Sequence, residues 1–172
     1  MKTRDIVHGD GPAEQRAELL KERIYISFTS LAVLLAMSSH SHTLEPSEAL
    51  TTLLITNAGT LLAVFLADVI AGIAIQERLP TSAELKHKMR VSFGAIGAVI
   101  APIIFLAVSV FGGWSLQVGL RAAAIALVVG LVVVTRIAIK RVKRPAWMKL
   151  LVLSAAAILG VAVIALELLA HG

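Results

Sequence analysis

Two polar side chains interrupt the apolar stretch from Thr51 to Ile75, and their types and spacing suggest chemistry inside a membrane. Asn57 and Asp68 are eleven residues apart, a spacing that returns an α-helix to nearly the same azimuth. Thr60 falls close to the same face. An ionised carboxylate in hydrocarbon is costly unless it meets water, a cation or a partner group, so Asp68 should face protein or a cavity. We predict that Asn57, Thr60 and Asp68, the polar stripe, form the working face.

Two interpretations of Asp68 are open. As a protonatable or cation-binding carboxylate, it would form a polar pathway with Asn57 and Thr60. Alternatively, it lies about seven residues, or roughly 10 Å, from one end of its helix and could form a structural ion pair with Arg90 or Arg136. Asn57 could likewise be an interhelical hydrogen-bonding residue of modest energy.

The elements that must position this stripe are membrane-spanning helices. Hydrophobic residues make up 58% of the 172 residues, whereas a soluble domain has roughly 45–50%. At about 20 residues per crossing, the length allows five or six spans and leaves no room for a soluble domain. We predict an all-α membrane bundle of five transmembrane helices over residues 24–172, after a cytoplasmic N-terminal segment, residues 1–23, made of a tail and a short amphipathic helix. The expected spans are about 24–39, 49–75, 91–111, 116–139 and 150–169.

Local signals mark where two of these helices begin. Pro46 and Glu48 fit the first and third positions of a helix that starts after Glu45. Thr81 and Glu84 have the spacing of a capping box, in which each side chain accepts a hydrogen bond from the backbone of the other residue.

The third span carries the residues that shape helix packing. Gly94 and Gly97 supply small side chains at a spacing that lets another helix approach closely. Pro102 at mid-span should kink the helix or free a carbonyl. A packing kink is favoured over a gate at this position.

The basic residues predict the orientation. Fifteen of the sixteen lysines and arginines lie in the N-terminal segment, in residues 76–90 or in residues 136–149, and only Arg121 falls on the opposite side. Because basic residues mark cytoplasmic loops, the N-terminus should be cytoplasmic and the C-terminus outside, in a multi-pass protein of a bacterial-type inner membrane. These charges face anionic lipid headgroups, so the excess of basic residues does not require nucleic-acid binding.

A second group of polar side chains gathers on the predicted outer side. It combines histidines and carboxylates that suit first-row divalent cations, namely His40, His42, Glu45, Glu167 and His171. Glu167 and His171 are four residues apart and share a helix face. The alternative is that His40 and His42 belong to a solvated turn and Glu167 to the membrane interface, because the spacing matches no closed zinc motif. No other cofactor is expected.

Several enzyme classes lack their required residues. The chain has no cysteine, which excludes disulfides, thiolate metal ligands and a cysteine nucleophile. The sequence also lacks a Gly-x-Ser-x-Gly elbow, a His-Glu-x-x-His pair and a glycine-rich phosphate loop. We therefore do not expect an enzyme.

Part of the chain, from about Ala58 to Ala170, resembles the vacuolar iron transporter family. The resemblance lies in the five-span topology, in a cytoplasmic helix that carries Lys86, His87 and Lys88, and in the third-span run from Ser92 to Pro102. It implies metal transport, with Asp68 as the residue carried over.

The chain also departs from that family. The family has an acidic residue in its first span and a Gly-Glu-Tyr-like element in its second, whereas here the first span has no acid and Leu66 to Val69 is only a loose counterpart. The family's cytoplasmic metal-collecting segment is missing apart from Glu77, Glu84 and His87. Metal transport is thus an analogy, because a shared fold does not establish function.

Two functions remain for a protein of this kind. The first is a small cation or proton-coupled transporter or channel, expected to be a homo-oligomer because five short helices enclose little polar path. The alternative is an accessory or assembly subunit whose polar stripe docks onto a partner membrane subunit. Both place the chain in the lipid bilayer.

Overall fold

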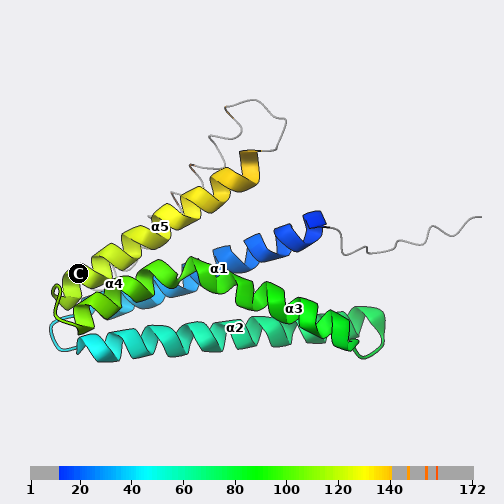
Figure 1. Ribbon diagram of the computed structural model, residues 1–172, viewed down its shortest axis with the longest axis horizontal. Helices are drawn as coiled ribbons and strands as arrows, with labels where there is room; N and C mark the ends of the chain where they lie inside the picture. Colours follow the sequence, from blue (N-terminus) through cyan, green and yellow to red (C-terminus); the bar gives the residue numbers. More distant parts are fainter. Residues whose placement is uncertain (1–11, 141–146, 148–153, 155–157, 159–172) are drawn as a thin grey trace, which may run out of the picture.

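The computed structural model describes residues 12–140 together with Trp147, Ser154 and Ile158. Every secondary-structure element within residues 12–140 is a helix (Figure 1). In chain order the helices are α1 (Pro12–Ser39), α2 (Pro46–Gln76), α3 (Ser82–Gly94), a short 3₁₀ helix η1 (Ala95–Ala98), α4 (Ile100–Val110) and α5 (Leu116–Lys140). This arrangement confirms the predicted all-α class.

The apolar helices are those of a small membrane protein with two to three candidate spans. By length and composition, α2 and residues Leu116–Ala138 of α5 can each cross a membrane, and α3, η1 and α4 can form one further, bent span. The helix α1 does not meet these criteria within the described residues. Five spans and the orientation therefore stay predictions, and the expected fifth span, 150–169, lies almost wholly outside the described residues.

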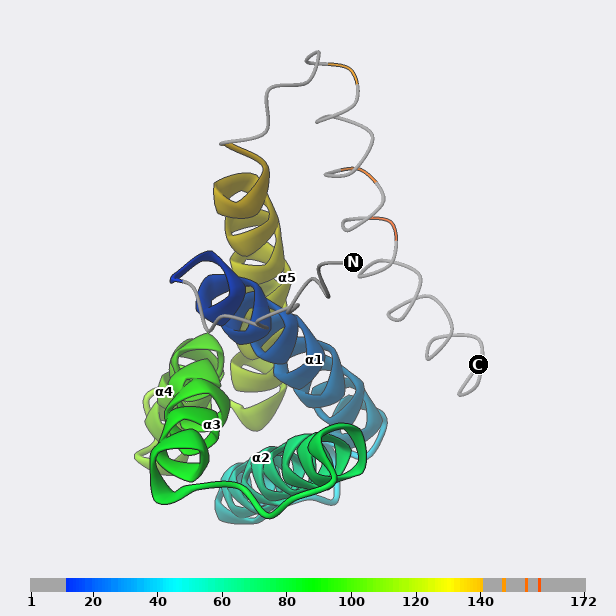
Figure 2. The ribbon, with the colours of Figure 1, turned by 90° about the vertical axis from the view of Figure 1, so that its right-hand side faces the viewer.

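The helix α1 has neighbours on several sides. It packs against α2, α3, η1 and α5, and the end view in Figure 2 shows it flanked by α2 and α5. Its core side chains include Ile26, Leu31 and Leu34, and Ser30 is also fully buried. Because other helices cover α1, it needs less hydrophobicity than a lipid-facing helix. It also runs unbroken through residue 23, so the predicted boundary between 23 and 24 falls inside a helix.

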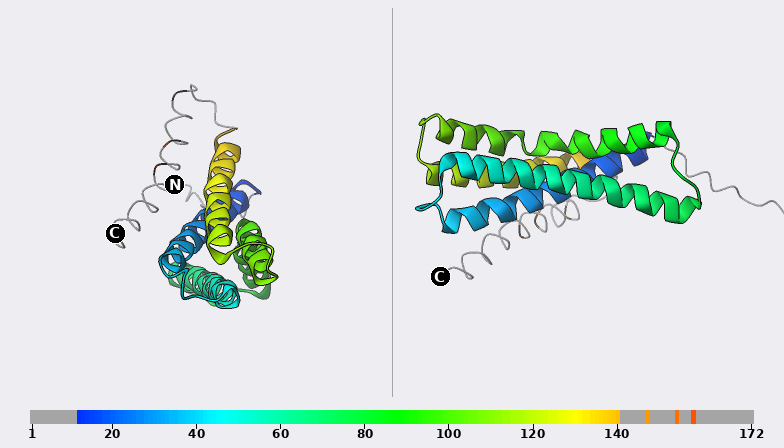
Figure 3. Two further views of the ribbon diagram at one scale, coloured as in Figure 1. Left: turned by 90° about the vertical axis from the view of Figure 1, so that its left-hand side faces the viewer. Right: turned by 90° about the horizontal axis from the view of Figure 1, so that it is seen from below.

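The long helices lie lengthwise along the bundle (Figure 3). The helix α2 contacts α1, α3 and α4, and α5 contacts α1 and α4. On α5 the buried apolar side chains extend from Leu116 to Leu131. Packing on α5 is therefore concentrated in its first two thirds.

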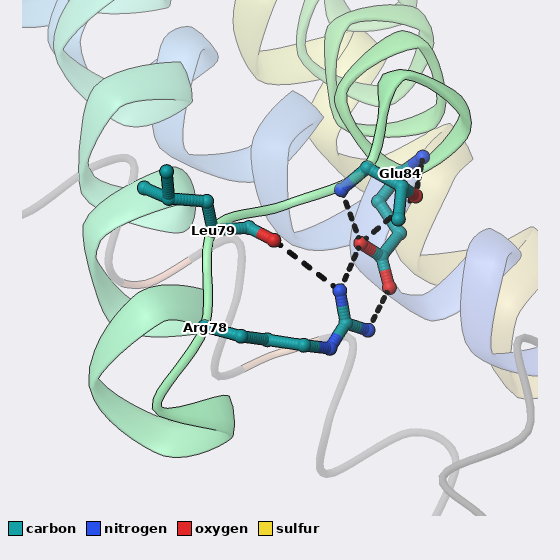
Figure 4. Close-up of polar contacts among 4 residues, drawn as sticks. Arg78, Leu79 and Glu84 are labelled. Carbon is teal, nitrogen blue, oxygen red and sulfur yellow. Dashed lines mark hydrogen bonds and ion pairs between the residues drawn. The ribbon is translucent and has the colours of Figure 1, made fainter.

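The predicted helix starts are confirmed. The backbone N–H of Glu45 donates to Glu48 Oε2 at 3.3 Å, immediately before α2. At the start of α3, the backbone N–H of Thr81 donates to Glu84 Oε2 at 2.7 Å, and the Glu84 N–H donates to Thr81 Oγ1 at 3.3 Å. Arg78 in the preceding link also donates to both oxygens of Glu84 (Figure 4), which braces the turn between α2 and α3.

The third predicted span is a broken helix, as Pro102 led us to expect. Proline has no N–H to offer the carbonyl four residues earlier, and its ring clashes with that carbonyl. That carbonyl belongs to Ala98, the last residue of η1, and the two halves of the span meet at a bend of 51°. Pro102 itself is buried.

The two glycines of this span do provide a close approach to α1. A Cβ atom added at Gly94 would lie 2.9 Å from Leu19 Cδ1, and one added at Gly97 would lie 3.4 Å from Arg23 Nη2. The small side chains therefore let α1 pack close to α3 and η1.

Candidate functional site

The polar stripe lies on the side of α2 that faces the bundle. Ala49, Leu53, Asn57 and Leu61 are buried at intervals of four residues. Continuing along the helix, Asp68 and Gly72 are half-buried, and so is Thr60 beside Asn57. The spacing of Asn57 and Asp68 thus places both toward protein.

The inner part of the stripe is a hydrogen bond between two helices. The Ser30 hydroxyl of α1 donates to Asn57 Oδ1 at 2.6 Å. Ser30 is 0% exposed and Asn57 is 4% exposed. This contact fits the interpretation of Asn57 as an interhelical hydrogen-bonding residue. Asn57 Nδ2, however, is buried without a hydrogen-bond partner in the described part of the chain.

Asp68 lies beside a lysine of α1. Lys21 Nζ is 3.8 Å from Asp68 Oδ1. The ion-pair partner is therefore Lys21, and Asp68 forms no ion pair with Arg90 or Arg136, the partners considered from the sequence, among the described residues. A second lysine, Lys88 of α3, donates to the backbone carbonyl of Asp68 at 2.8 Å.

The same Lys21 contacts a buried carboxylate. Its Nζ is 3.1 Å from Glu22 Oε1, and Glu22 is only 3% exposed. Glu22 Oε1 accepts no hydrogen bond within residues 12–140, so its contact with Lys21 is an ion pair. We call Lys21, Glu22 and Asp68 the charged cluster.

The neighbouring carboxylates affect the lysine as well. Burial acts to lower the pKa of Lys21, but Glu22, Asp68 and Glu18 together outweigh it and raise that pKa. Lys21 therefore stays a cation over the whole physiological range.

Two more polar atoms near this end of the bundle lack partners. Arg23 Nε and Ser92 Oγ are buried without a hydrogen bond among the described residues. Arg23 packs on Gly97 of η1, and Ser92 of α3 is 0% exposed. The space between α1, α2 and α3 is thus more polar than the rest of the core.

Sequence reasoning missed Glu22 because it assigned the residue to a cytoplasmic segment. A signal was present: Glu22, Ile26 and Ser30 are four residues apart and therefore share one helix face. Extending the helix face that contains Ser30 back along α1 would have predicted that Glu22 is buried.

The histidines and carboxylates predicted for the outer side do not come together among the residues that the structure describes. His40, His42 and Glu45 are exposed, and no three His, Cys, Asp or Glu side chains among the described residues are placed to hold a metal ion. The His40 ring contacts Ser39 Oγ at 2.9 Å. Glu167 and His171 lie outside the described residues, so the predicted divalent-cation site stays a prediction.

Comparisons with protein-family models, curated proteins and solved structures gave no match to this chain. The resemblance to the vacuolar iron transporter family therefore rests on the sequence pattern alone.

Proposed function

We propose that this protein moves a cation or a proton across the bacterial inner membrane, through the polar groups that α1, α2 and α3 hold between them. The observation that carries the proposal is Glu22, a carboxylate 3% exposed in a largely apolar bundle. Burying a charge costs several kcal/mol, and a buried ion pair can often be replaced by apolar side chains without loss of stability. A carboxylate kept in such a place is more readily explained by function than by stability.

The exposed apolar residues of α2 indicate how far lipid extends along this helix. Ile70 is 56% exposed and Ile75 is 80% exposed, and both lie beyond Asp68 toward the end of the helix. Lipid is the natural cover for these side chains. At 1.5 Å per residue, Ile75 is roughly 10 Å beyond Asp68, so lipid can cover the outward face of α2 at the level of Asp68, whereas the exposed parts of Lys21 and Asp68 must face water.

A second candidate function has support of its own. Asp68 already has a basic partner in Lys21, as expected for a structural ion pair. The outward face of α2, with Leu54, Ile55 and Leu62 exposed, would then dock onto another membrane subunit. In that case the chain is an accessory or assembly protein without transport activity.

Flux measurements in proteoliposomes separate the two functions. Purified protein would be tested for movement of protons and of iron, manganese and zinc ions, with Asp68→Asn as the variant and Glu48→Gln, an exposed carboxylate in the first turn of the same helix, as the control. We expect Asp68→Asn to lower flux at least about tenfold, because a tenfold change needs only about 1.4 kcal/mol. Undiminished flux in the variant would exclude the transport role of Asp68. No flux from folded, inserted protein would favour the accessory function.

A further inference from the structure

Buried polar atoms that lack a hydrogen-bond partner are concentrated on α1, α2 and α3, which contact one another pairwise. Among the described residues they are Glu22 Oε1, Arg23 Nε, Asn57 Nδ2 and Ser92 Oγ. Glu22 Oε1 has its ion pair with Lys21. We propose that these three helices bind water molecules between them, one at Asn57 and one at Ser92. The inference goes beyond the two functions proposed above, because bound water satisfies these atoms whether or not an ion moves.

The amide of Asn57 is satisfied at one end only. Its Oδ1 accepts a hydrogen bond of 2.6 Å from the Ser30 hydroxyl, and its Nδ2 donates none among the described residues. Exchanging the nitrogen and the oxygen of the amide would leave the oxygen without a partner instead. Asn57 is 4% exposed, and a buried polar group without a partner is destabilising. The unpaired end of this amide therefore requires a partner that the described side chains do not supply.

The hydroxyl of Ser92 makes no bond to its own helix. Hydroxyls inside helices commonly donate to the carbonyl four residues earlier, and here this bond is made by Ser27, Thr29, Thr51, Ser109 and Thr135. Ser92 is 0% exposed and does not make it to Lys88. The two residues share one face of α3, and the Lys88 ammonium donates to the backbone carbonyl of Asp68. Ser92 therefore lies on the side of α3 that faces α2.

Water is the ligand that fits both positions. An amide nitrogen only donates, whereas a hydroxyl both donates and accepts, and water can pair with either group. At Asn57 the Ser30 hydroxyl, which keeps lone pairs, and Thr60, three residues along the same helix, can offer further hydrogen bonds. A metal ion does not fit, because an amide nitrogen is not a ligand and no three His, Cys, Asp or Glu side chains converge in the part of the chain that is described.

Apolar side chains separate the level of Asn57 from the charged cluster. Glu22 and Ser30 are eight residues apart on α1, about 12 Å at 1.5 Å per residue, and Ile26 lies midway on the same face. Ile26 is 1% exposed, and Leu61, one turn beyond Asn57 on α2, is 6% exposed. We therefore expect separate water positions and not a continuous file, so each position can be tested by itself.

Solid-state NMR of the full native chain in vesicles of deuterated phospholipid tests the position at Asn57. Asn57 is the only asparagine of the chain, so nitrogen-15 asparagine gives one side-chain amide signal and one backbone amide signal. Magnetisation passes directly from water only to groups close to it. We expect its initial transfer to the side-chain amide to be several-fold faster than to the backbone amide, which is an N–H within α2. Equal initial rates, or no transfer to the side chain, would overturn the proposal at Asn57.

A matched pair of serine substitutions tests the position at Ser92. Ser27 is 5% exposed and its hydroxyl donates to the Arg23 carbonyl at 2.7 Å, so Ser27→Ala removes a satisfied hydroxyl. Both substitutions gain the same intrinsic helix propensity. If Ser92 binds water, Ser92→Ala should lower the midpoint of unfolding in denaturing detergent at least as far as Ser27→Ala. If the hydroxyl has no partner, its removal relieves a cost, and a midpoint above that of Ser27→Ala would overturn the proposal at Ser92.

Neither measurement depends on flux. A chain that moves no ion should still show water contact at the Asn57 side chain, and a chain that moves ions without that contact would contradict the water site alone. Failure of the transport function and failure of this inference are therefore distinguishable.

Discussion

The acidic side chains near the link between α2 and α3 differ in how much of each side chain is exposed. Glu22 is enclosed between helices, whereas Glu77 is exposed. Asp68 is intermediate and shares Lys21 with Glu22. The helices packed around each position, and not the side chain itself, therefore determine how enclosed each carboxylate is.

The α2–α3 link contains a carboxylate whose environment favours its charge. Arg78 donates to Glu84 Oε1 at 2.6 Å and to Oε2 at 3.0 Å, and Thr81 adds backbone and hydroxyl donors (Figure 4). These hydrogen bonds, from Arg78 first and Thr81 second, lower the pKa of Glu84 to about 2. The bonds that Glu84 makes are therefore fully present above its ordinary pKa of 4.5 and are lost as the pH falls toward 2.

A titration followed by carbon-13 NMR of labelled glutamate checks this prediction. Glu84 should titrate with a midpoint near 2 in the native protein. Arg78→Gln removes the main donor and should move the midpoint toward the ordinary value. Arg90→Gln serves as the matched control, because Arg90 does not contact Glu84. A midpoint that is the same with and without Arg78 would contradict the assigned cause.

At the scale of elements, the broken span explains how α1 comes so close to its neighbours. Pro102 interrupts hydrogen bonding at Ala98, and the chain bends there by 51°. On the N-terminal side of the bend, Gly94 and Gly97 leave room for Leu19 and Arg23 of α1. The bend and the glycines together allow α1 to pack along η1 as well as α2 and α5.

Valine substitutions should separate a packed glycine from an open one. At Gly94 an added Cβ would be 2.9 Å from Leu19 Cδ1, whereas at Gly130 of α5 nothing lies within 4 Å. We expect Gly94→Val to lower the free energy of unfolding by up to about 1 kcal/mol more than Gly130→Val, because the methyl group at the end of the flexible Leu19 side chain must move aside. Steric-trap unfolding in bicelles measures the difference. Equal effects of the two substitutions would show that the contact between α1 and α3 is not tight.

At the scale of the molecule, the helices form a bundle in which α1 has protein neighbours while α2 exposes a long apolar face. A helix of 31 residues such as α2 is about 46 Å long at 1.5 Å per residue, whereas the hydrocarbon core is about 30 Å thick. The helix α2 must therefore tilt in the membrane or extend beyond its hydrocarbon core. Its packing against α1 and α4 sets the tilt.

Cysteine labelling tests the predicted orientation. The chain has no cysteine of its own, so single substitutions at Thr43 and Lys86, both exposed, report without background. In intact cells a membrane-impermeant maleimide should label Thr43→Cys and should label Lys86→Cys only after permeabilisation, because basic residues keep their loop on the cytoplasmic side. The reverse pattern would overturn the orientation with a cytoplasmic N-terminus.

The sequence alone was sufficient to predict those features that depend on a few neighbouring residues. The helix starts at Pro46 and Ser82 follow from capping within one turn, and the bend follows from the missing N–H of Pro102. The all-α class and the inward face of Asn57 and Asp68 follow from composition and periodicity. Each of these depends on the local backbone, so each can be predicted without knowing how the helices meet.

Only the tertiary structure could decide which groups meet across helices. Periodicity shows that Asp68 faces protein, but it does not show that Lys21, far away in sequence, lies opposite. It also cannot show that Glu22 is enclosed, because a carboxylate in the first turns of α1 is exposed or buried according to the helices packed around it. The pairing in the charged cluster is a property of helix packing, which brings together residues that no local pattern relates.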